Sequence, residues 1–345
     1  MWEATAAISA VALLVLLGLW ARSRGRLGPR RTRDAGPRAV PGWADFLEPE
    51  QLRAFMEVLE LALAERELEA VQREGVVAVA LPDGRPLQLG LRNLAQRCAH
   101  LEPGRWADVV GEHIDTLLGA EAEVDAIDRA DFDAVRPLLK VRLYPSEALE
   151  QSQADAVILA HPCPGLAAVL VYDLPNTVSS VPQAEAGAWG RSPEELLAVG
   201  LKNLAADPAP DRQDVDVDVD VEVEVERGVV LRRLSGPSFF VASHLLLLER
   251  LLPQKLAYGA LVCAPTRHLL LLHTIRDSRV LLAINAMIPE AHECYRRGPG
   301  SLTPNLYWWH DGQLTHLPTT VEPGKVKLTP PAVFVERVME PMAEA

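Results

Sequence analysis

Residues 239–288 constrain the fold of this chain more than any other part of the sequence. Only seven of these fifty residues are charged, and apolar segments of this density occupy the interior of a domain. A leucine-rich run follows Ser243, a residue type that favours the N-cap of a helix, and ends before Pro253. The stretch therefore predicts a helix that starts after Ser243 and ends before Pro253, strands over residues 259–264 and 269–275 joined by a turn at Pro265-Thr266-Arg267, and a second helix over about residues 280–287.

The rest of the body alternates short strands and helices. Ser192 and Glu195 form a capping box with Pro193 at the first helical position, which predicts a helix to Leu204. Asp311-Gly312 is a hairpin turn between two apolar runs. We expect an α+β body over residues 45–320, mainly antiparallel sheet with helices packed on one face. It could divide into two subdomains near residue 145, and the Pro-rich tail at 321–345 should lie along the surface.

An uncharged, mostly apolar run covers residues 4–21. As a helix rising 1.5 Å per residue it would span about 27 Å, enough for the hydrocarbon layer of a bilayer. Trp2 and Trp20 bracket the run, where aromatic rings favour the membrane interface. We therefore expect a transmembrane anchor over residues 1–21. The alternative is a secretory signal cleaved near residues 21–23, but such a signal has its positive charge before the apolar run.

Seven arginines follow the apolar run and orient the anchor. Residues 1–42 hold these arginines against Glu3 and Asp34, a balance of +5. The positive-inside rule keeps them in the cytosol, so we expect a single-pass protein of the inner (cell) membrane with its N-terminus outside and its body in the cytoplasm. Residues 22–44 then form an Arg-, Pro- and Gly-rich linker that lies against the lipid bilayer.

The remaining chain is strongly acidic. From residue 43 on it carries 27 Lys and Arg against 45 Asp and Glu, a net charge of −18. Such a body repels phosphate backbones, so we expect no nucleic-acid partner. The four cysteines, Cys98, Cys163, Cys263 and Cys294, include no CxxC pair. Their number and spacing suit free thiols in a reducing compartment, which agrees with a cytosolic body.

Several short motifs follow one another across roughly residues 50–317. They are Arg136-Pro137-Leu138-Leu139-Lys140-Val141-Arg142 with Tyr144-Pro145, Leu170-Val171-Tyr172-Asp173-Leu174, Trp189-Gly190, Glu194-Glu195-Leu196, Lys202-Asn203-Leu204, Ala242-Ser243, Ala264-Pro265-Thr266-Arg267 and Ser301-Leu302-Thr303-Pro304. Their order resembles the YtpQ-like family of bacterial proteins, a domain of unknown function. The family has no established activity or catalytic residues to carry over, and a cytosolic function of its plainer soluble members would fit a cytosol-facing body. The anchor and the acidic tract described next depart from the plainer members.

The tract from Asp214 to Glu226 alternates strictly between seven carboxylates and six valines. Period two places the carboxylates on one face of a strand and the valines on the other. Neighbouring carboxylates on one face are about 6.5–7 Å apart, too far for two of them to chelate one Ca²⁺ without help. We expect an exposed acidic edge strand that resists aggregation, and no metal site.

Two His-x-Cys pairs are the candidates for metal or nucleophilic chemistry. His161 with Cys163 and His292 with Cys294 would together supply a Cys₂His₂ zinc set. Cys163 with His161 could instead be a nucleophile with its base, although only Gly165 suggests an oxyanion-forming turn nearby. Buried structural cysteines beside exposed histidines are the simpler interpretation, so we assign no catalytic, cofactor or metal residue.

Two further features could contact a ligand. Arg267, next to His268, lies at a strand turn, where ligand-binding residues concentrate, or it caps its own sheet. Trp308-Trp309-His310 could form a stacking platform, but two adjacent tryptophans on a strand point to opposite faces, so one should pack into the core.

Two classes of function remain. No Walker loop, dinucleotide fingerprint, GxSxG or HExxH motif occurs in the sequence, and these motifs mark common enzyme classes. The first class is a membrane-tethered interaction or adaptor module that binds a protein partner at the cytosolic face. The alternative is a hydrolase that uses Cys163 and His161.

Overall fold

The computed structural model describes residues 40–80, 86–150, 157–217, 229–252, 256–322 and 325–343. The chain divides into two compact units, one up to Ile114 and one from Asp115 onward. The anchor predicted over residues 1–21 lies outside the described residues. Within the described ranges, no helix combines the length and the apolar character needed to cross a membrane.

The first unit contains an antiparallel sheet in the order β1-β2-β3. Pro49 is the first residue of its long helix, where Pro is favoured, and a capping box between Glu48 and Gln51 supplies hydrogen-bond partners for the N-terminal N–H groups. That helix ends at Glu65, and the next α-helix begins at Leu91, directly after β3. The elements are η1 (Gly42–Ala44), α2 (Pro49–Glu65), β1 (Ala70–Arg73), β2 (Val76–Ala80), β3 (Pro86–Gly90), α3 (Leu91–Ala99), η2 (Pro103–Arg105) and α4 (Trp106–Asp125), which continues into the second unit.

The second unit begins with a four-stranded antiparallel sheet in which β6 pairs with β4, β5 and β7. The predicted helix after Ser192 is confirmed, with the capping box formed by Ser192 and Glu195. The side chain of Asn203 donates to the carbonyls of Arg136 (2.7 Å) and Leu139 (2.8 Å), which fixes this helix to β4. The elements are α5 (Phe132–Val135), η3 (Arg136–Leu138), β4 (Leu139–Pro145), α6 (Ser146–Glu150), β5 (Leu159–Cys163), β6 (Leu166–Asp173), β7 (Val178–Ser180), α7 (Gln183–Ala188) and α8 (Pro193–Leu204).

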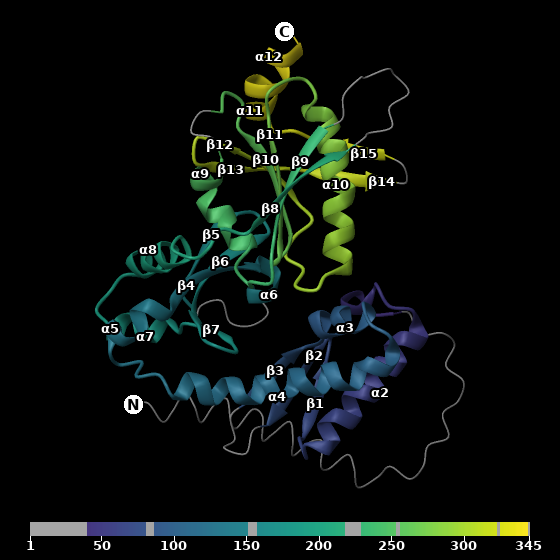
Figure 1. Ribbon diagram of the computed structural model, residues 1–345, viewed down its shortest axis with the longest axis vertical. Coiled ribbons are helices and arrows are strands. Elements are labelled where there is room, and N and C mark those ends of the chain that lie inside the picture. Colours follow the sequence, from purple (N-terminus) through teal and green to yellow (C-terminus); the bar gives the residue numbers. More distant parts are fainter. Residues whose placement is uncertain are drawn as a thin grey trace. The chain divides into compact units, whose positions relative to one another are not determined.

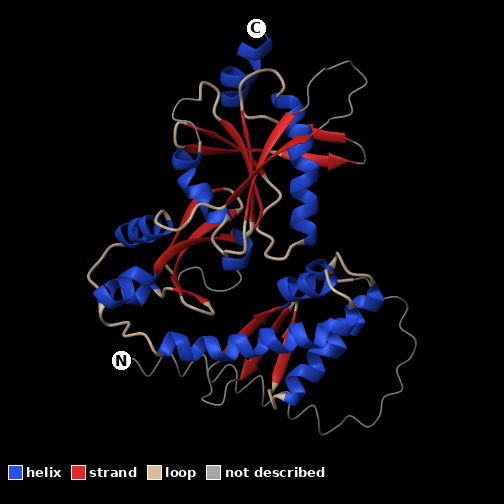
Figure 2. Ribbon diagram, in the orientation of Figure 1, coloured by secondary structure: helices blue, strands red, loops and turns tan. Residues whose placement is uncertain are grey.

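A six-stranded antiparallel sheet follows in the order β13-β12-β10-β11-β9-β8 (Figures 1 and 2). The strands predicted from the apolar stretch are its two central members, and all seven residues of β10 are buried. The α+β class with antiparallel sheets is therefore confirmed. The elements are β8 (Asp211–Val217), β9 (Val229–Ser235), η5 (Ala242–Leu247), α9 (Leu248–Leu251), β10 (Ala260–Thr266), β11 (Leu269–Thr274), α10 (Val280–Arg297), β12 (Leu306–His310) and β13 (Gln313–Leu317).

Both faces of the six-stranded sheet are covered, whereas we expected helices on one face only. Leu261 and Leu271 pack with Met287 of α10 in one core cluster. Val262 and Leu272 pack in a second cluster with residues of β4, β6, η5 and α9. Residues at odd and even positions of β10 and β11 are therefore apolar alike, because successive side chains enter different cores.

The prediction of an α-helix that starts after Ser243 is wrong for the first residues of this segment. Residues 242–247 form the 3₁₀ helix η5 before the single turn α9. Ser243 caps nothing, because its hydroxyl accepts the backbone N–H of Leu143 at 3.1 Å and ties η5 to β4. The second helix, α10, runs to Arg297, past Pro289 inside it, and so exceeds the predicted end at Met287.

The hairpin through Asp311-Gly312 is confirmed, and both turn residues have positive φ, 48° and 77°. The tail after it does not merely lie along the surface. Phe334 and Val338 are fully buried in the core that includes α10, because the tail folds back instead of extending. Its elements are β14 (Thr319–Glu322), β15 (Lys325–Leu328), α11 (Ala332–Phe334), the π-helix η6 (Val335–Met339) and α12 (Glu340–Ala343).

Candidate functional site

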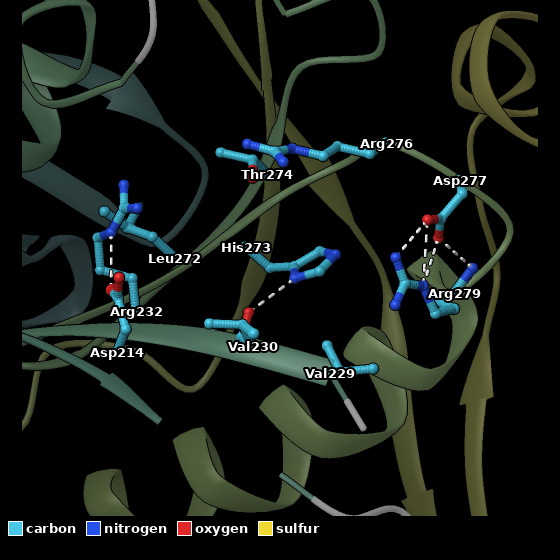
Figure 3. A pocket seen from close by; sticks show the side chains of 10 residues that line it. All are labelled: Asp214, Val229, Val230, Arg232, Leu272, His273, Thr274, Arg276, Asp277 and Arg279. Carbon is cyan, nitrogen blue, oxygen red and sulfur yellow. Dashed lines mark hydrogen bonds and ion pairs between the residues drawn. The ribbon is translucent and has the colours of Figure 1, made fainter. Parts of the chain in front are cut away.

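A polar pocket of about 290 Å³ lies where β9 and β11 separate. We call it the β9–β11 pocket. It is small compared with typical ligand sites of about 300–1,000 Å³, so it would hold a single chemical group or one end of a larger molecule. Its lining residues are Asp214, Val229, Val230, Arg232, Leu272, His273, Thr274, Arg276, Asp277 and Arg279 (Figure 3).

The pocket exists because the ladder between the two strands stops early. Pairing of β11 with β9 ends at Leu272 and Arg232, although both strands continue. Nδ1 of His273 lies 3.0 Å from the carbonyl oxygen of Val230, so the ring takes up an acceptor that a longer ladder could have used. Because a carbonyl only accepts, the hydrogen bond places the proton on Nδ1 and leaves Nε2 as an acceptor. Burial lowers the pKa of His273 and favours this neutral ring.

Both carboxylates of the pocket are held by arginines. Asp214 accepts from Arg232 at 3.0 Å and from Arg212 at 2.7 Å. These two hydrogen bonds lower the pKa of Asp214 to about 2. Asp277 accepts from the side chain of Arg279 and from its backbone N–H, and the guanidinium lowers the pKa of Asp277. Both carboxylates are therefore ionised at neutral pH and already occupied as acceptors.

Arg276 differs from its neighbours. It is exposed, and no hydrogen bond or ion pair joins its side chain to any residue within the described ranges. Figure 3 shows its guanidinium extending back over Thr274, with no dashed line to another lining residue. Three arginines and two carboxylates line the pocket, an excess of one positive charge, and Arg212 outside the lining adds another through its contact with Asp214. The body as a whole has a net charge of −18, so the local charge at this pocket is complementary to an anionic group.

Binding accounts for this arrangement better than catalysis. Asp214 and Asp277 are occupied by arginines and so are poorly placed to act as a general base. His273 has one ring nitrogen committed to a backbone carbonyl. The pocket presents an open guanidinium, a threonine hydroxyl and the exposed side chain of Val230, which together suit a ligand that is anionic at one point and apolar beside it.

Cys163 and His161 do not form a nucleophile–base pair at a polar cleft. Cys163 is 6% exposed and belongs to a core cluster, whereas His161 is exposed on β5. Burial raises the pKa of the Cys163 thiol to about 12. A thiol with that pKa is protonated at neutral pH, and the protonated form is a poor nucleophile.

The two His-x-Cys pairs are not brought together. Cys163 packs in the cluster on one face of the six-stranded sheet, while Cys294 packs against the cluster on the other. Throughout the described ranges, no group of three or more His, Cys, Asp or Glu side chains is placed to hold a metal ion. The separation of the two pairs therefore gives no support to the zinc alternative.

Arg267 and His268 are engaged within their own turn. The Arg267 guanidinium lies 5.1 Å from the centre of the Phe239 ring, and its Nε donates to Nε2 of His268 at 3.2 Å. Nδ1 of His268 lies 3.1 Å from the carbonyl oxygen of Ser238. These contacts match the interpretation in which the arginine caps its own sheet.

Trp308 and Trp309 point to opposite faces, as predicted. Trp308 is buried in the cluster that contains Phe334, and Trp309 packs against the other cluster. The imidazole of His310 stacks on Trp308 with ring centres 5.0 Å apart. The proposed platform is therefore part of the core.

The acidic tract starts in an edge strand. Within the described ranges β8 pairs with β9 alone, over Asp211–Val217, and Asp214 and Asp216 are exposed while Val215 is partly buried. This confirms the alternation at the start of the tract. Residues 218–228, with five of its seven carboxylates, lie outside the described residues.

We found no match to this chain among protein-family models, curated proteins or solved structures. The resemblance to the YtpQ-like family stays a prediction.

The sequence contained a signal for this pocket that we did not use. Three of the seven charged residues in the apolar stretch, Arg276, Asp277 and Arg279, fall within the five positions after β11. Charge concentrated at the end of a buried strand marks the point where that strand reaches solvent. The partners Asp214 and Arg232 could not be inferred this way, because the strand order decides which residues meet.

Proposed function

We propose that this protein is a membrane-tethered interaction module whose body faces the cytosol and binds a protein partner through the β9–β11 pocket. The observation that carries this proposal is the Arg276 guanidinium, which is exposed at a pocket whose carboxylates are already paired with other arginines. A partner that brings an anionic group would find a complementary charge there.

The sequence supports the membrane part of the proposal. The apolar run at 4–21 is followed by seven arginines, and moving each of them across a membrane costs about 2.3 kcal/mol per 100 mV. The anchor helix therefore stays uncleaved, with residues from Arg22 onward in the cytoplasm. Protease added to intact cells should leave the body untouched, and N-terminal sequencing should find residues 1–20 attached. A mature start near Gly25, or digestion of the body, would contradict this topology.

The pocket supports binding over hydrolysis. A hydrolase that uses Cys163 would need a thiolate, yet burial raises the pKa of this thiol to about 12. The exposed position of His161 supplies no buried base beside the sulfur. These properties favour the interaction module.

Affinity capture of the full chain from detergent-solubilised membranes tests the partner-binding role. The Arg276→Gln variant removes the open charge, and Arg296→Gln removes a charge on α10 that lies outside the pocket lining. We expect a partner that the parent chain and Arg296→Gln retain and that Arg276→Gln loses. Equal recovery by all three chains would show that the pocket is not the binding surface.

A further inference from the structure

The backbone at the β9–β11 pocket is arranged to receive another strand. In an antiparallel ladder, successive residues direct their N–H and C=O groups to opposite sides of the strand. Ile275 donates to Gly259 at 3.0 Å on the side of β10, so the neighbouring residue Thr274 directs its groups toward β9. The ladder on that side has already ended at Leu272 and Arg232. Thr274 therefore presents backbone groups to the pocket.

The opposite wall has the matching arrangement. Arg232 pairs with Leu272 across the ladder, so by the same alternation Val230 directs its N–H and C=O toward the pocket. The His273 ring takes the carbonyl of Val230, which leaves its N–H group directed into the opening. The pocket is thus bordered by strand backbone on two sides, with a length of only one or two residues.

The side chains that line the β9–β11 pocket determine which kind of ligand it can bind. Arg276 lines the pocket together with Thr274 (Figure 3), and Arg232 uses only Nε to reach Asp214. Val230 is 50% exposed, and Leu272, which also lines the pocket, is 1% exposed, so these two residues form an apolar wall for a ligand side chain. An extended segment that continued past the pocket would need a longer groove than about 290 Å³ provides.

We propose that the pocket captures the C-terminal carboxylate of a partner polypeptide, with the last residues extended and an apolar final side chain against Val230. The carboxylate accepts from Arg276 and from strand N–H groups, a known mode of chain-end recognition. The proposal rests on the proposed function, since it names the chemistry by which the same pocket binds its partner.

Fluorescence anisotropy with the full chain in detergent micelles tests this. The probe is fluorescein-labelled Gly-Ser-Gly-Ala-Val-Val with a free carboxylate, compared with the same peptide ending in an amide. We expect saturable binding of the free acid and an affinity for the amide that is roughly tenfold or more lower, the loss expected of one charge-assisted hydrogen bond. Arg276→Gln should lose a similar factor, Arg276→Lys should recover part of it, and Arg296→Gln should bind as the parent does. Far-ultraviolet circular dichroism checks that each variant is folded.

Three outcomes would overturn the carboxylate proposal. Equal binding of acid and amide would show peptide recognition without a role for the chain end. Displacement of the peptide by inorganic phosphate at equal ionic strength and similar concentration would indicate a general oxyanion site. No binding of the free acid, in a chain whose membrane capture still depends on Arg276, would refute this ligand and leave the interaction module standing.

Discussion

Strands β10 and β8 belong to one sheet and differ in almost every physical respect. β10 pairs on both sides and is covered on both faces, so all seven of its residues are buried. Among the residues that the structure describes, β8 pairs with β9 alone, and it exposes Asp214 and Asp216. The difference separates the part of this sheet that stabilises the fold from the part to which we assign partner binding. The centre supplies the packed core, and the β9–β11 pocket beside the edge carries the exposed charge on which the proposed function rests.

The largest effect should come from the centre. Leu271 on β11 is fully buried, whereas Leu281 on α10 is 47% exposed. Leu271→Ala should lower the free energy of unfolding by about 2–5 kcal/mol, because it removes buried methyl groups and leaves a cavity. Leu281→Ala should stay within about 0.5 kcal/mol of the parent. Urea denaturation measures both, and similar losses for the two variants would contradict the assignment of the core.

The rate of thiol alkylation should also distinguish the buried centre of the sheet from the partly buried helix α10. Cys263 on β10 is fully buried and burial raises the pKa of its thiol, while Cys294 on α10 is only partly buried. Iodoacetamide at pH 8 should modify Cys294 first and leave Cys263 and Cys163 protected until the chain unfolds. Peptide mass spectrometry at successive times gives the order. Rapid native-state modification of Cys163 would revive the hydrolase alternative.

His273, which lines the β9–β11 pocket, should make the free energy of unfolding depend on pH. Burial is the main cause that lowers its pKa in the folded chain, and the unfolded chain has a pKa of about 6.5. The unfolded state therefore binds the proton first, so the contribution of His273 to stability is complete above about pH 6.5 and declines as the pH falls toward the folded value. A titration of the ring by NMR measures the shift, and comparison of unfolding curves with His273→Gln isolates its effect. A folded pKa above 6.5 would contradict the geometry.

The smallest effect should come from the edge. Asp214 is paired with two arginines, but its side chain is 40% exposed, and solvent screens such pairs. Asp214→Asn should change the free energy of unfolding by about 0–1 kcal/mol. The same variant should strengthen binding of the free-acid peptide, because it removes a negative charge beside Arg232. A large loss of stability would show that the edge contributes to folding more than this comparison allows.

The pocket shows where prediction from sequence stops. The run of charges after β11 was visible in the sequence, but its role depends on β9 and β8, which lie about forty or more positions away along the chain. The Cys163–His161 pair shows the reverse case. Its spacing suggested chemistry, and the tertiary packing buried the sulfur in the core and left the imidazole in solvent.

Local patterns by themselves determined the α8 capping box, the Asp311-Gly312 hairpin and the two central strands, because caps, turns and runs of buried residues depend on neighbours in the chain. Only the tertiary structure decided that both faces of the six-stranded sheet are covered and that the tail carries Phe334 into the core. It also decided that the 3₁₀ helix η5 forms where an α-helix was expected. There the Ser243 hydroxyl accepts a hydrogen bond from the backbone N–H of Leu143, a hundred residues away. Such choices depend on which distant surfaces need covering, and local propensity is too weak to oppose burial.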